Sequence, residues 1–154
     1  MTAKIWTIGY EYVGLPDFVA ALQAADVELL VDVREIANSR RAGFAKKALS
    51  GALDEAGIAY VHMKAIGTPK AGRDAAHKGD VATMHAIYEQ KLEMPEAQLA
   101  LRELVDMAQS QRACLMCLEH DWRGCHRSLI TDALATFDIE PVHLDATHPG
   151  TVFS

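Results

Sequence analysis

At 154 residues, half of them hydrophobic, the chain can bury one hydrophobic core and is short for two domains. A net charge of -6 argues against a surface that binds nucleic acid by being basic throughout, because neutralising phosphates requires clustered Lys and Arg. Three cysteines, with no leader-like start and no apolar run that could span a bilayer, predict a cytoplasmic protein in a reducing compartment, without a membrane partner.

The first part of the chain alternates short apolar runs with segments of helical spacing. Residues 4–8 form a β-type run, and apolar residues at helical spacing then follow Pro16. Residues 28–33 are almost continuously apolar, which is typical of a strand covered on both faces. The pattern then predicts a helix over residues 45–56 and a third strand over residues 58–63.

The second part begins with residues 64–80, which are rich in Gly and Pro and show no apolar period. This composition predicts a long surface loop, and long loops inside compact domains are often functional. The later segments follow the earlier alternation. Helices are predicted over residues 81–92 and 96–110, and Pro95 stands in the first turn of the second of these. A strand over residues 114–118, a helix over 128–137 and a strand over 141–144 follow.

This order of elements predicts an α/β fold: a single three-layer α/β/α domain over residues 1–154, Rossmann-like, with a mostly parallel sheet of about five strands. The order of the strands within the sheet does not follow from the pattern. In parallel sheets, ligands bind outside the carboxyl ends of the strands. Side chains that follow the predicted strands are therefore the candidates for a functional site.

Polar residues are dense at these strand ends. In the third predicted strand, Tyr60 and His62 point to one face of the sheet and Val61 to the other, so one of these two faces is turned to the core. A buried, hydrogen-bonded position is expected for Tyr60. The candidates for binding a ligand from the first three strands are Gly9, Tyr10, Asp32, Arg34, Tyr60 and His62.

The fourth predicted strand leads directly into a polar run and the next helix. Cys117 and Glu119 end the strand, whereas Cys125, His126 and Arg127 stand where the helix begins. Unpaired backbone N–H groups and the helix dipole favour anions there and lower the pKa of a thiol. Glu119, Cys125, His126 and Cys117 are the candidate catalytic residues and Arg127 a candidate anion ligand, although both cysteines could equally be packing residues.

A metal site is a further possibility because Cys114 and Cys117 form a Cys-x-x-Cys motif. Alternation along a strand sends these two side chains to opposite faces of the sheet, so they cannot readily share one ion. No metal ligand is therefore assigned from the sequence.

The segment from Arg34 to Lys47 is basic in an otherwise acidic chain. Such a cluster beside Phe44 could hold phosphates with a base stacked on the ring, or could be a solvated linker. Arg40 and Arg41 are added to the ligand-binding candidates on this basis.

Together these motifs closely resemble a family catalogued as domain of unknown function 488, over nearly the whole chain. The motifs that carry the resemblance are Thr7-Ile8-Gly9-Tyr10, Val31-Asp32-Val33-Arg34, Ser39-Arg40-Arg41 with Phe44, Tyr60-Val61-His62 with Gly67, and Cys117-x-Glu119 followed by Cys125-His126-Arg127-Ser128. The resemblance implies a compact cytoplasmic α/β domain with these polar positions in one cleft, and it supplies no reaction. The chain departs from the commonest family form at Tyr10, where a His is frequent, and at Ala65-Ile66-Gly67-Thr68, where a Leu-Gly-Gly run is usual.

The leading functional hypothesis is an enzyme, a hydrolase or transferase, that acts on a phosphorylated or other anionic substrate such as a nucleotide or a nucleic-acid end. Two alternatives stay open at this point: a non-catalytic module that binds nucleotides or nucleic acid, and a thiol-redox or metal-binding structural domain. The cofactor is unknown, and so is the oligomeric state.

Overall fold

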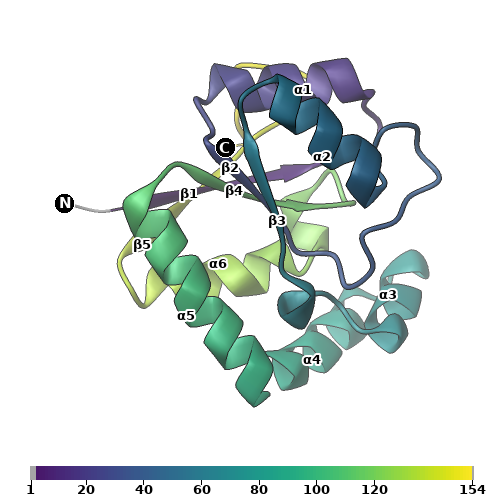
Figure 1. The fold of residues 1–154 in the computed structure, drawn as a ribbon. Helices are drawn as coiled ribbons and strands as arrows, with labels where there is room; N and C mark the ends of the chain where they lie inside the picture. The colour runs from purple at the N-terminus through teal and green to yellow at the C-terminus, as the bar shows by residue number, and fades with distance from the viewer. Residues whose placement is uncertain (1–2, 154) are drawn as a thin grey trace.

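A computed structural model describes residues 3–153 and contains one sheet of five parallel strands (Figure 1). The strands are β1 (Ala3–Gly9), β2 (Leu29–Asp32), β3 (Ala59–His62), β4 (Ala113–Cys117) and β5 (Ile139–His143). They are ordered β3-β2-β4-β1-β5 across the sheet. The predicted α/β class, the parallel sheet and the number of strands are confirmed, and the structure adds the strand order.

Helices cover both faces of the sheet (Figure 1). On one face lie α1 (Leu15–Ala24) and α2 (Lys46–Glu55), and on the other lie α4 (Val81–Leu92), α5 (Pro95–Ser110) and α6 (Arg127–Ala135). Pro16 and Pro95 stand in the first turns of their helices, where a missing N–H costs nothing. Each face therefore has its own hydrophobic core.

Alternation along β4 shows how the two cores are separated. Cys114 and Met116 belong to the core under α1 and α2, whereas Leu115 and Cys117 belong to the opposite core. The prediction that Cys114 and Cys117 face opposite sides is thus confirmed, because successive side chains of a strand point to opposite faces. Of Cys114 and Cys117, only Cys117 lies on the face of the sheet that α6 covers.

The strand order also explains where a cleft can form. β4 lies between β1 and β2, but the chain leaves β4 toward α6 on one face, and leaves β1 and β2 toward α1 and α2 on the other. Connections that diverge from adjacent strands open a crevice at the carboxyl ends of those strands. The ends of β1, β2 and β4 are therefore the expected position of a ligand site.

The prediction of a long surface loop over residues 64–80 is wrong. The segment forms a short 3-10 helix, η1 (Lys64–Ile66), and α3 (Lys70–His77), which packs against α4. Gly72 is buried inside α3, where a Cβ would lie 2.7 Å from the Thr68 side chain. Glycine is thus used for close packing in this helix, and it obscured the helical pattern in the sequence.

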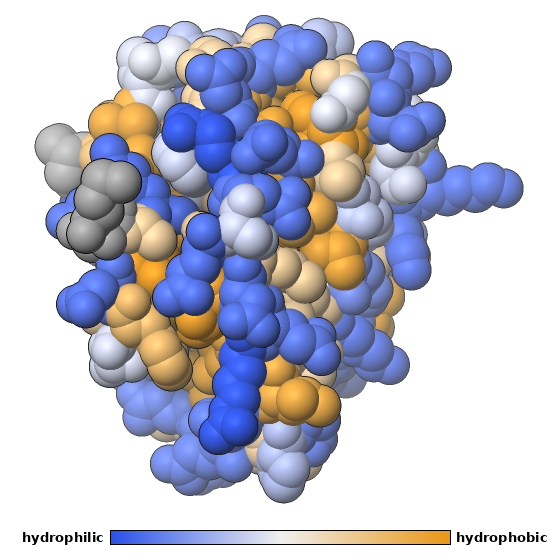
Figure 2. Space-filling model, turned by 60° about the vertical axis from the view of Figure 1, so that its left-hand side comes forward, coloured by the Kyte–Doolittle hydropathy of each residue, from blue (hydrophilic) through white to orange (hydrophobic). Residues whose placement is uncertain are grey.

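The surface presents no large continuous apolar face in the view of Figure 2, where hydrophobic side chains are interspersed with hydrophilic ones. No helix within residues 3–153 is both long enough and apolar enough to cross a membrane.

Candidate functional site

A cleft of about 200 Å³ opens where β1, β2 and β4 end. One wall comes from the strand exits and from the start of α6, and the other from the segment that carries α3 and α4. The lining residues are Tyr10, Arg34, Glu35, Ile36, Asn38, Thr68, Arg73, Ala76, His77, Met84, Cys117, Leu118, Glu119 and His126.

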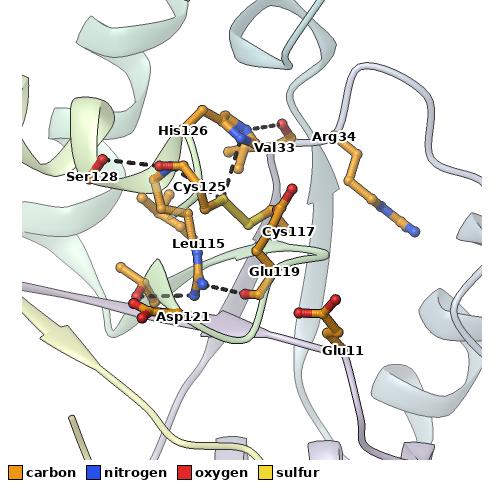
Figure 3. Close-up of a disulfide and its surroundings, with 12 residues drawn as sticks. Glu11, Val33, Arg34, Leu115, Cys117, Glu119, Asp121, Cys125, His126 and Ser128 are labelled. Atoms are coloured by element: carbon orange, nitrogen blue, oxygen red, sulfur yellow. Dashed lines mark hydrogen bonds between the residues drawn. A yellow bond between two sulfur atoms is a disulfide. The ribbon is translucent and has the colours of Figure 1, made fainter. Parts of the chain in front are cut away.

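A disulfide links Cys117, the last residue of β4, to Cys125, two residues before α6 (Figure 3). Their Cα atoms are 7.6 Å apart. Cys117 lines the cleft although only 1 % of its surface is exposed, and Cys125 is completely buried behind it. The sulfur of Cys125 also accepts a hydrogen bond from the backbone N–H of Arg127, at 3.5 Å. The remaining cysteine, Cys114, is buried in the opposite core and unpaired.

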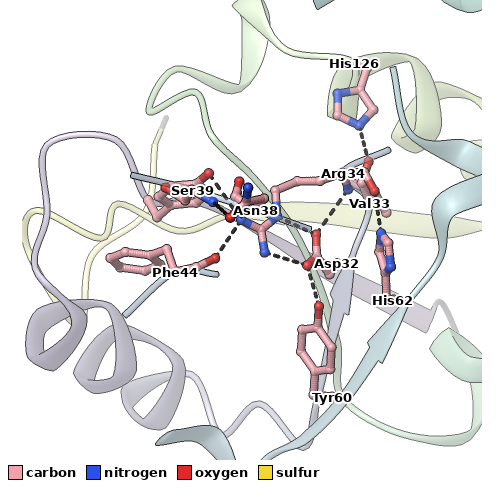
Figure 4. A network of polar contacts seen from close by, with 10 residues as sticks. Asp32, Val33, Arg34, Asn38, Ser39, Phe44, Tyr60, His62 and His126 are labelled. Carbon is pink, nitrogen blue, oxygen red and sulfur yellow. Dashed lines mark hydrogen bonds and ion pairs between the residues drawn. The ribbon is translucent and has the colours of Figure 1, made fainter. Parts of the chain in front are cut away.

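His126 holds a defined tautomer beside this disulfide. Its Nε2–H donates to the carbonyl of Val33 at 2.8 Å (Figures 3 and 4). Nδ1 lies 3.5 Å from the sulfur of Cys125. Burial lowers the pKa of His126 to about 4, so the ring is neutral at pH 7. Because Nε2 carries the proton, the lone pair of Nδ1 is directed at the sulfur pair.

Arg34 forms part of the cleft wall but is held by its own neighbours (Figure 4). It makes a bidentate pair with Asp32, with Nε–Oδ1 and Nη2–Oδ2 distances of 2.9 and 2.7 Å. Nη1 donates to the carbonyl of Phe44 at 2.7 Å. Burial alone would lower the pKa of Arg34, but the hydrogen bonds and charge of Asp32 raise it overall. Its charge is thus largely offset within the protein.

The neighbours of Asp32 and Arg34 complete this network. The hydroxyl of Tyr60 donates to Asp32 Oδ2 at 2.5 Å, and burial followed by this hydrogen bond raises the pKa of Tyr60. His62 Nε2–H donates to the carbonyl of Arg34 at 2.6 Å. Among the ligand-binding candidates, Asp32, Tyr60 and His62 therefore support Arg34 and are absent from the cleft lining.

Arg127 is buried beneath the exit of β4. Its Nη2 donates to the carbonyl of Glu119 at 2.5 Å and Nη1 to the hydroxyl of Thr7 at 3.3 Å. Within residues 3–153 no carboxylate forms an ion pair with it. Burial lowers the pKa of Arg127 to about 10, so the side chain is still charged at neutral pH. It fixes the loop that presents Glu119 to the cleft.

The Glu119 carboxyl shares the cleft with Cys117. Burial raises the pKa of Glu119, and the charge of Arg127 opposes this shift. A carboxyl group with a raised pKa is suited to donating and accepting a proton near neutral pH.

Comparison with known proteins places this arrangement in a family. The family model described as Domain of unknown function DUF488 matches residues 14–134. The chain belongs to this family. No curated protein and no solved structure is significantly similar to the chain. The predicted resemblance is therefore confirmed, and the reaction has to be argued from the DUF488 cleft itself.

Several of the predicted site residues do meet in the DUF488 cleft. Tyr10, Arg34, Cys117, Glu119 and His126 line it, although they come from three strand exits and one helix start. Gly9 lies beneath the Glu119 carbonyl, where a Cβ would be 1.8 Å from the oxygen. The structure therefore brings these five residues from distant parts of the chain into one cleft, as the parallel sheet predicted.

The basic segment does not reach the cleft as a unit. Arg40 and Arg41 are exposed and absent from the cleft lining, and Arg41 Nη2 donates to the carbonyl of Val13 at 2.5 Å. Base stacking on Phe44, one of the two alternatives for the basic segment, is contradicted by the burial of this residue. Its ring is completely buried and stacks on Tyr10, with centroids 4.6 Å apart. The apolar ring contributes more by filling the core than it could at the surface.

Sequence reasoning missed two features of the site. The first is the wall from α3, where Arg73 Nη1 donates to Glu35 Oε1 and to the carbonyl of Thr68, both at 2.9 Å. The second is the pairing of Cys117 with Cys125. The only available signal for the pairing was that both cysteines flank one short loop between β4 and α6.

Proposed function

We propose that the DUF488 cleft is the active site of an enzyme that catalyses thiol–disulfide exchange through Cys117 and Cys125. One observation carries the proposal: two cysteines form a disulfide, of which Cys117 lines the cleft and Cys125 lies behind it, next to His126 just before α6. Exchange needs one sulfur that a substrate can reach and a second that can leave and return.

The reaction uses the two sulfurs in different roles. A substrate thiolate attacks Cys117 Sγ, the Cys117–Cys125 bond breaks, and its electron pair goes to Cys125. A second substrate thiol then attacks the mixed disulfide, which releases the substrate disulfide and leaves Cys117 as a thiolate. Two electrons pass from two substrate thiols to the protein disulfide, and the two substrate protons go to the protein sulfurs or to solvent. The reverse direction reduces a substrate disulfide.

The surroundings of Cys125 suit a leaving thiolate. Its sulfur accepts the N–H of Arg127 at the start of α6, where the helix dipole lowers the pKa of a thiol. The unprotonated Nδ1 of His126, 3.5 Å away, can accept a hydrogen bond from the Cys125 thiol in the reduced form. Glu119, in the same cleft as Cys117, can exchange a proton with the substrate sulfur.

The test follows the oxidised protein with a small thiol such as glutathione. We expect two protein thiols to appear per molecule as the substrate disulfide forms. When oxidised glutathione is supplied instead, the Cys117 thiolate of the Cys125→Ser variant should attack it, release one glutathione and accumulate as a mixed disulfide visible by mass spectrometry, because the resolving sulfur is gone. The matched control is Cys114→Ala, which changes the third cysteine on the opposite face of the sheet and should react like the wild-type protein.

Two results would contradict the proposal. One is that Cys117 and Cys125 stay reduced in the presence of excess oxidised glutathione. The other is that Cys125→Ser exchanges thiols at the wild-type rate without a trapped intermediate.

The anionic-substrate hypothesis has a separate observation in its favour. Arg73 and His77 from α3 line the cleft opposite Cys117 and Glu119, so a phosphate or carboxylate could bind there while Glu119 or His126 moves a proton. This second candidate predicts turnover of a phosphorylated substrate that is lost in Arg73→Ala and in Glu119→Gln but kept in Cys125→Ser. A nucleotide or nucleic acid held at Arg40 and Arg41 instead would show binding that weakens with salt and with Arg40→Ala.

A further inference from the structure

A cluster of potential metal ligands lies at the same place as the disulfide. Cys117, Cys125 and His126 are all buried, and each offers one ligand atom within 4.8 Å of the other two. Two thiolates and an imidazole are the ligand types that favour Zn²⁺ and similar soft ions over Mg²⁺ or Ca²⁺. Cys117 is the last residue of β4, whereas Cys125 and His126 directly precede α6.

The histidine is already oriented as metal-binding histidines usually are. Such residues almost always donate their second ring N–H to a carboxylate, a backbone carbonyl or water, which fixes the tautomer and directs the other nitrogen at the ion. In His126 this partner is the carbonyl of Val33, and Nδ1 is the nitrogen beside the Cys125 sulfur. Tyr88 packs against the edge of the ring, with centroids 4.9 Å apart, and restricts its rotation.

The backbone spacing of the cysteines also suits an ion between them. Their Cα atoms are 7.6 Å apart, whereas most disulfides span about 4.4–6.8 Å between Cα atoms. Two thiolates on one tetrahedral Zn²⁺, each at about 2.3 Å, have sulfur atoms about 3.8 Å apart. The separation of β4 and α6 is therefore ample for a metal-bridged pair.

The charge of Cys117 and Cys125 as thiolates, after reduction of their disulfide, favours binding of a cation. Two buried thiolates without a counter-ion would carry a large desolvation cost. A divalent ion cancels their charge, and the neutral imidazole of His126 adds a third ligand without adding charge. Cys117 lines the cleft, so a fourth coordination position would open toward the cleft, as it does in catalytic rather than structural zinc sites.

We infer that the reduced form of this protein binds one Zn²⁺ through Cys117, Cys125 and His126, and that oxidation to the Cys117–Cys125 disulfide releases the ion. This inference rests on the proposed thiol–disulfide function, because the cysteines must be reduced before they can act as ligands. Reduction of the disulfide by two thiols supplies two electrons and two protons. Binding of the ion then displaces the two cysteine protons to solvent.

Co²⁺ is the probe for the test, since its bonds to thiolate give intense charge-transfer absorption and its visible bands report tetrahedral geometry. The full-length protein is reduced with a phosphine, the phosphine is removed, and Co²⁺ is titrated in without oxygen. We expect one Co²⁺ per chain with a spectrum of two thiolates, loss of the spectrum on adding Zn²⁺, and at most one-tenth of the wild-type affinity in Cys117→Ser, Cys125→Ser and His126→Gln. Cys114→Ala is the matched cysteine control and should retain the wild-type titration.

The outcomes separate this inference from the proposed function. If oxidised glutathione converts the two reduced thiols back to the disulfide but no charge-transfer band appears with Co²⁺, the metal site is wrong and the exchange function stands. If Co²⁺ binds but the cysteines never form a disulfide, release by oxidation is wrong, and the exchange function with it. A full signal in Cys117→Ser and Cys125→Ser, with circular dichroism showing that both are folded, would place the ion elsewhere and overturn the site.

Discussion

Backbone carbonyl groups, more than opposite charges, orient the polar side chains of the site. His126 donates to Val33, His62 to Arg34 and Arg127 to Glu119. Each of these carbonyls belongs to the chain just beyond β2 or β4. The exits of the two strands are thus held in one conformation by side chains from other segments, which is what a preorganised site requires.

Gly9 is the residue on which this arrangement depends most directly. A Cβ there would lie 1.8 Å from the Glu119 carbonyl oxygen and 3.1 Å from Arg127 Nη2. We predict that Gly9→Ala displaces the exit of β4 and lowers the free energy of unfolding by about 1–3 kcal/mol, the usual range for overpacking. It should also slow thiol exchange, because Glu119 and Cys117 move with that exit.

Denaturant unfolding and the glutathione assay measure the two effects of Gly9→Ala. The control is Gly51→Ala in α2, where a Cβ meets nothing within 4 Å. This substitution within a helix should leave the free energy of unfolding unchanged or raise it by up to about 1 kcal/mol. If the two variants were equally stable, the chain after β4 would be able to move away from the added Cβ without lowering the free energy of unfolding.

At the scale of elements, α4 connects the two walls of the cleft. Tyr88 is completely buried in α4, its hydroxyl donates to the carbonyl of Ile66 at 2.5 Å, and its ring packs against His126. The hydroxyl thereby holds η1, while the ring supports the residue beside the disulfide. These two contributions can be separated by mutation.

We predict that Tyr88→Phe lowers the free energy of unfolding by about 1 kcal/mol, because it leaves the buried carbonyl of Ile66 without its donor. The ring stays in place, so the rate of thiol exchange should not change. Tyr88→Ala should cost about 3–5 kcal/mol through the cavity it leaves, and should also release His126. Thermal unfolding and the exchange assay on both variants check this, and a Tyr88→Phe protein with impaired exchange would contradict the division of roles.

The sequence predicted these elements unevenly, for physical reasons. The strands and the helices α1, α2, α4, α5 and α6 carry regular apolar patterns, so their approximate bounds were accessible. Helix α3 was missed because Gly72 is required for its close packing on Thr68, and a glycine in that place resembles a loop residue. The convergence of Tyr10, Arg34 and Glu119 followed from parallel strands alone. The contribution of Arg73 and the pairing of Cys117 with Cys125 depend on tertiary distances that no local pattern encodes.

At the scale of the whole molecule, the two layers of helices bury histidines in their neutral form. His143 on β5 is hydrogen-bonded through Nδ1 to the hydroxyl of Thr7, 2.6 Å away, and that hydroxyl also accepts from Arg127. The ring also stacks on Trp122, with centroids 4.0 Å apart. Protonation of His143 would place a second positive charge near Arg127.

This arrangement makes the protein sensitive to acid. Burial, and then the charges of Arg127 and Arg123, lower the pKa of His143 to about 4, whereas a histidine in the unfolded chain has a pKa of about 6.5. Between these values the unfolded state binds more protons than the folded state, so the free energy of unfolding must fall as the pH drops from about 6.5 toward 4. We expect His143 to account for about 1–3 kcal/mol of this loss.

Urea unfolding at a series of pH values measures the effect. In His143→Gln the curve of stability against pH should be flatter over that interval than in the wild-type protein, even if the variant is less stable at pH 7. Leu99→Gln, at an exposed position of α5, offers the control, since it changes no titratable group and should keep the wild-type slope. An equal slope in His143→Gln and wild type would mean that the buried imidazole does not stay neutral on folding. The acid sensitivity would then have to come from another group.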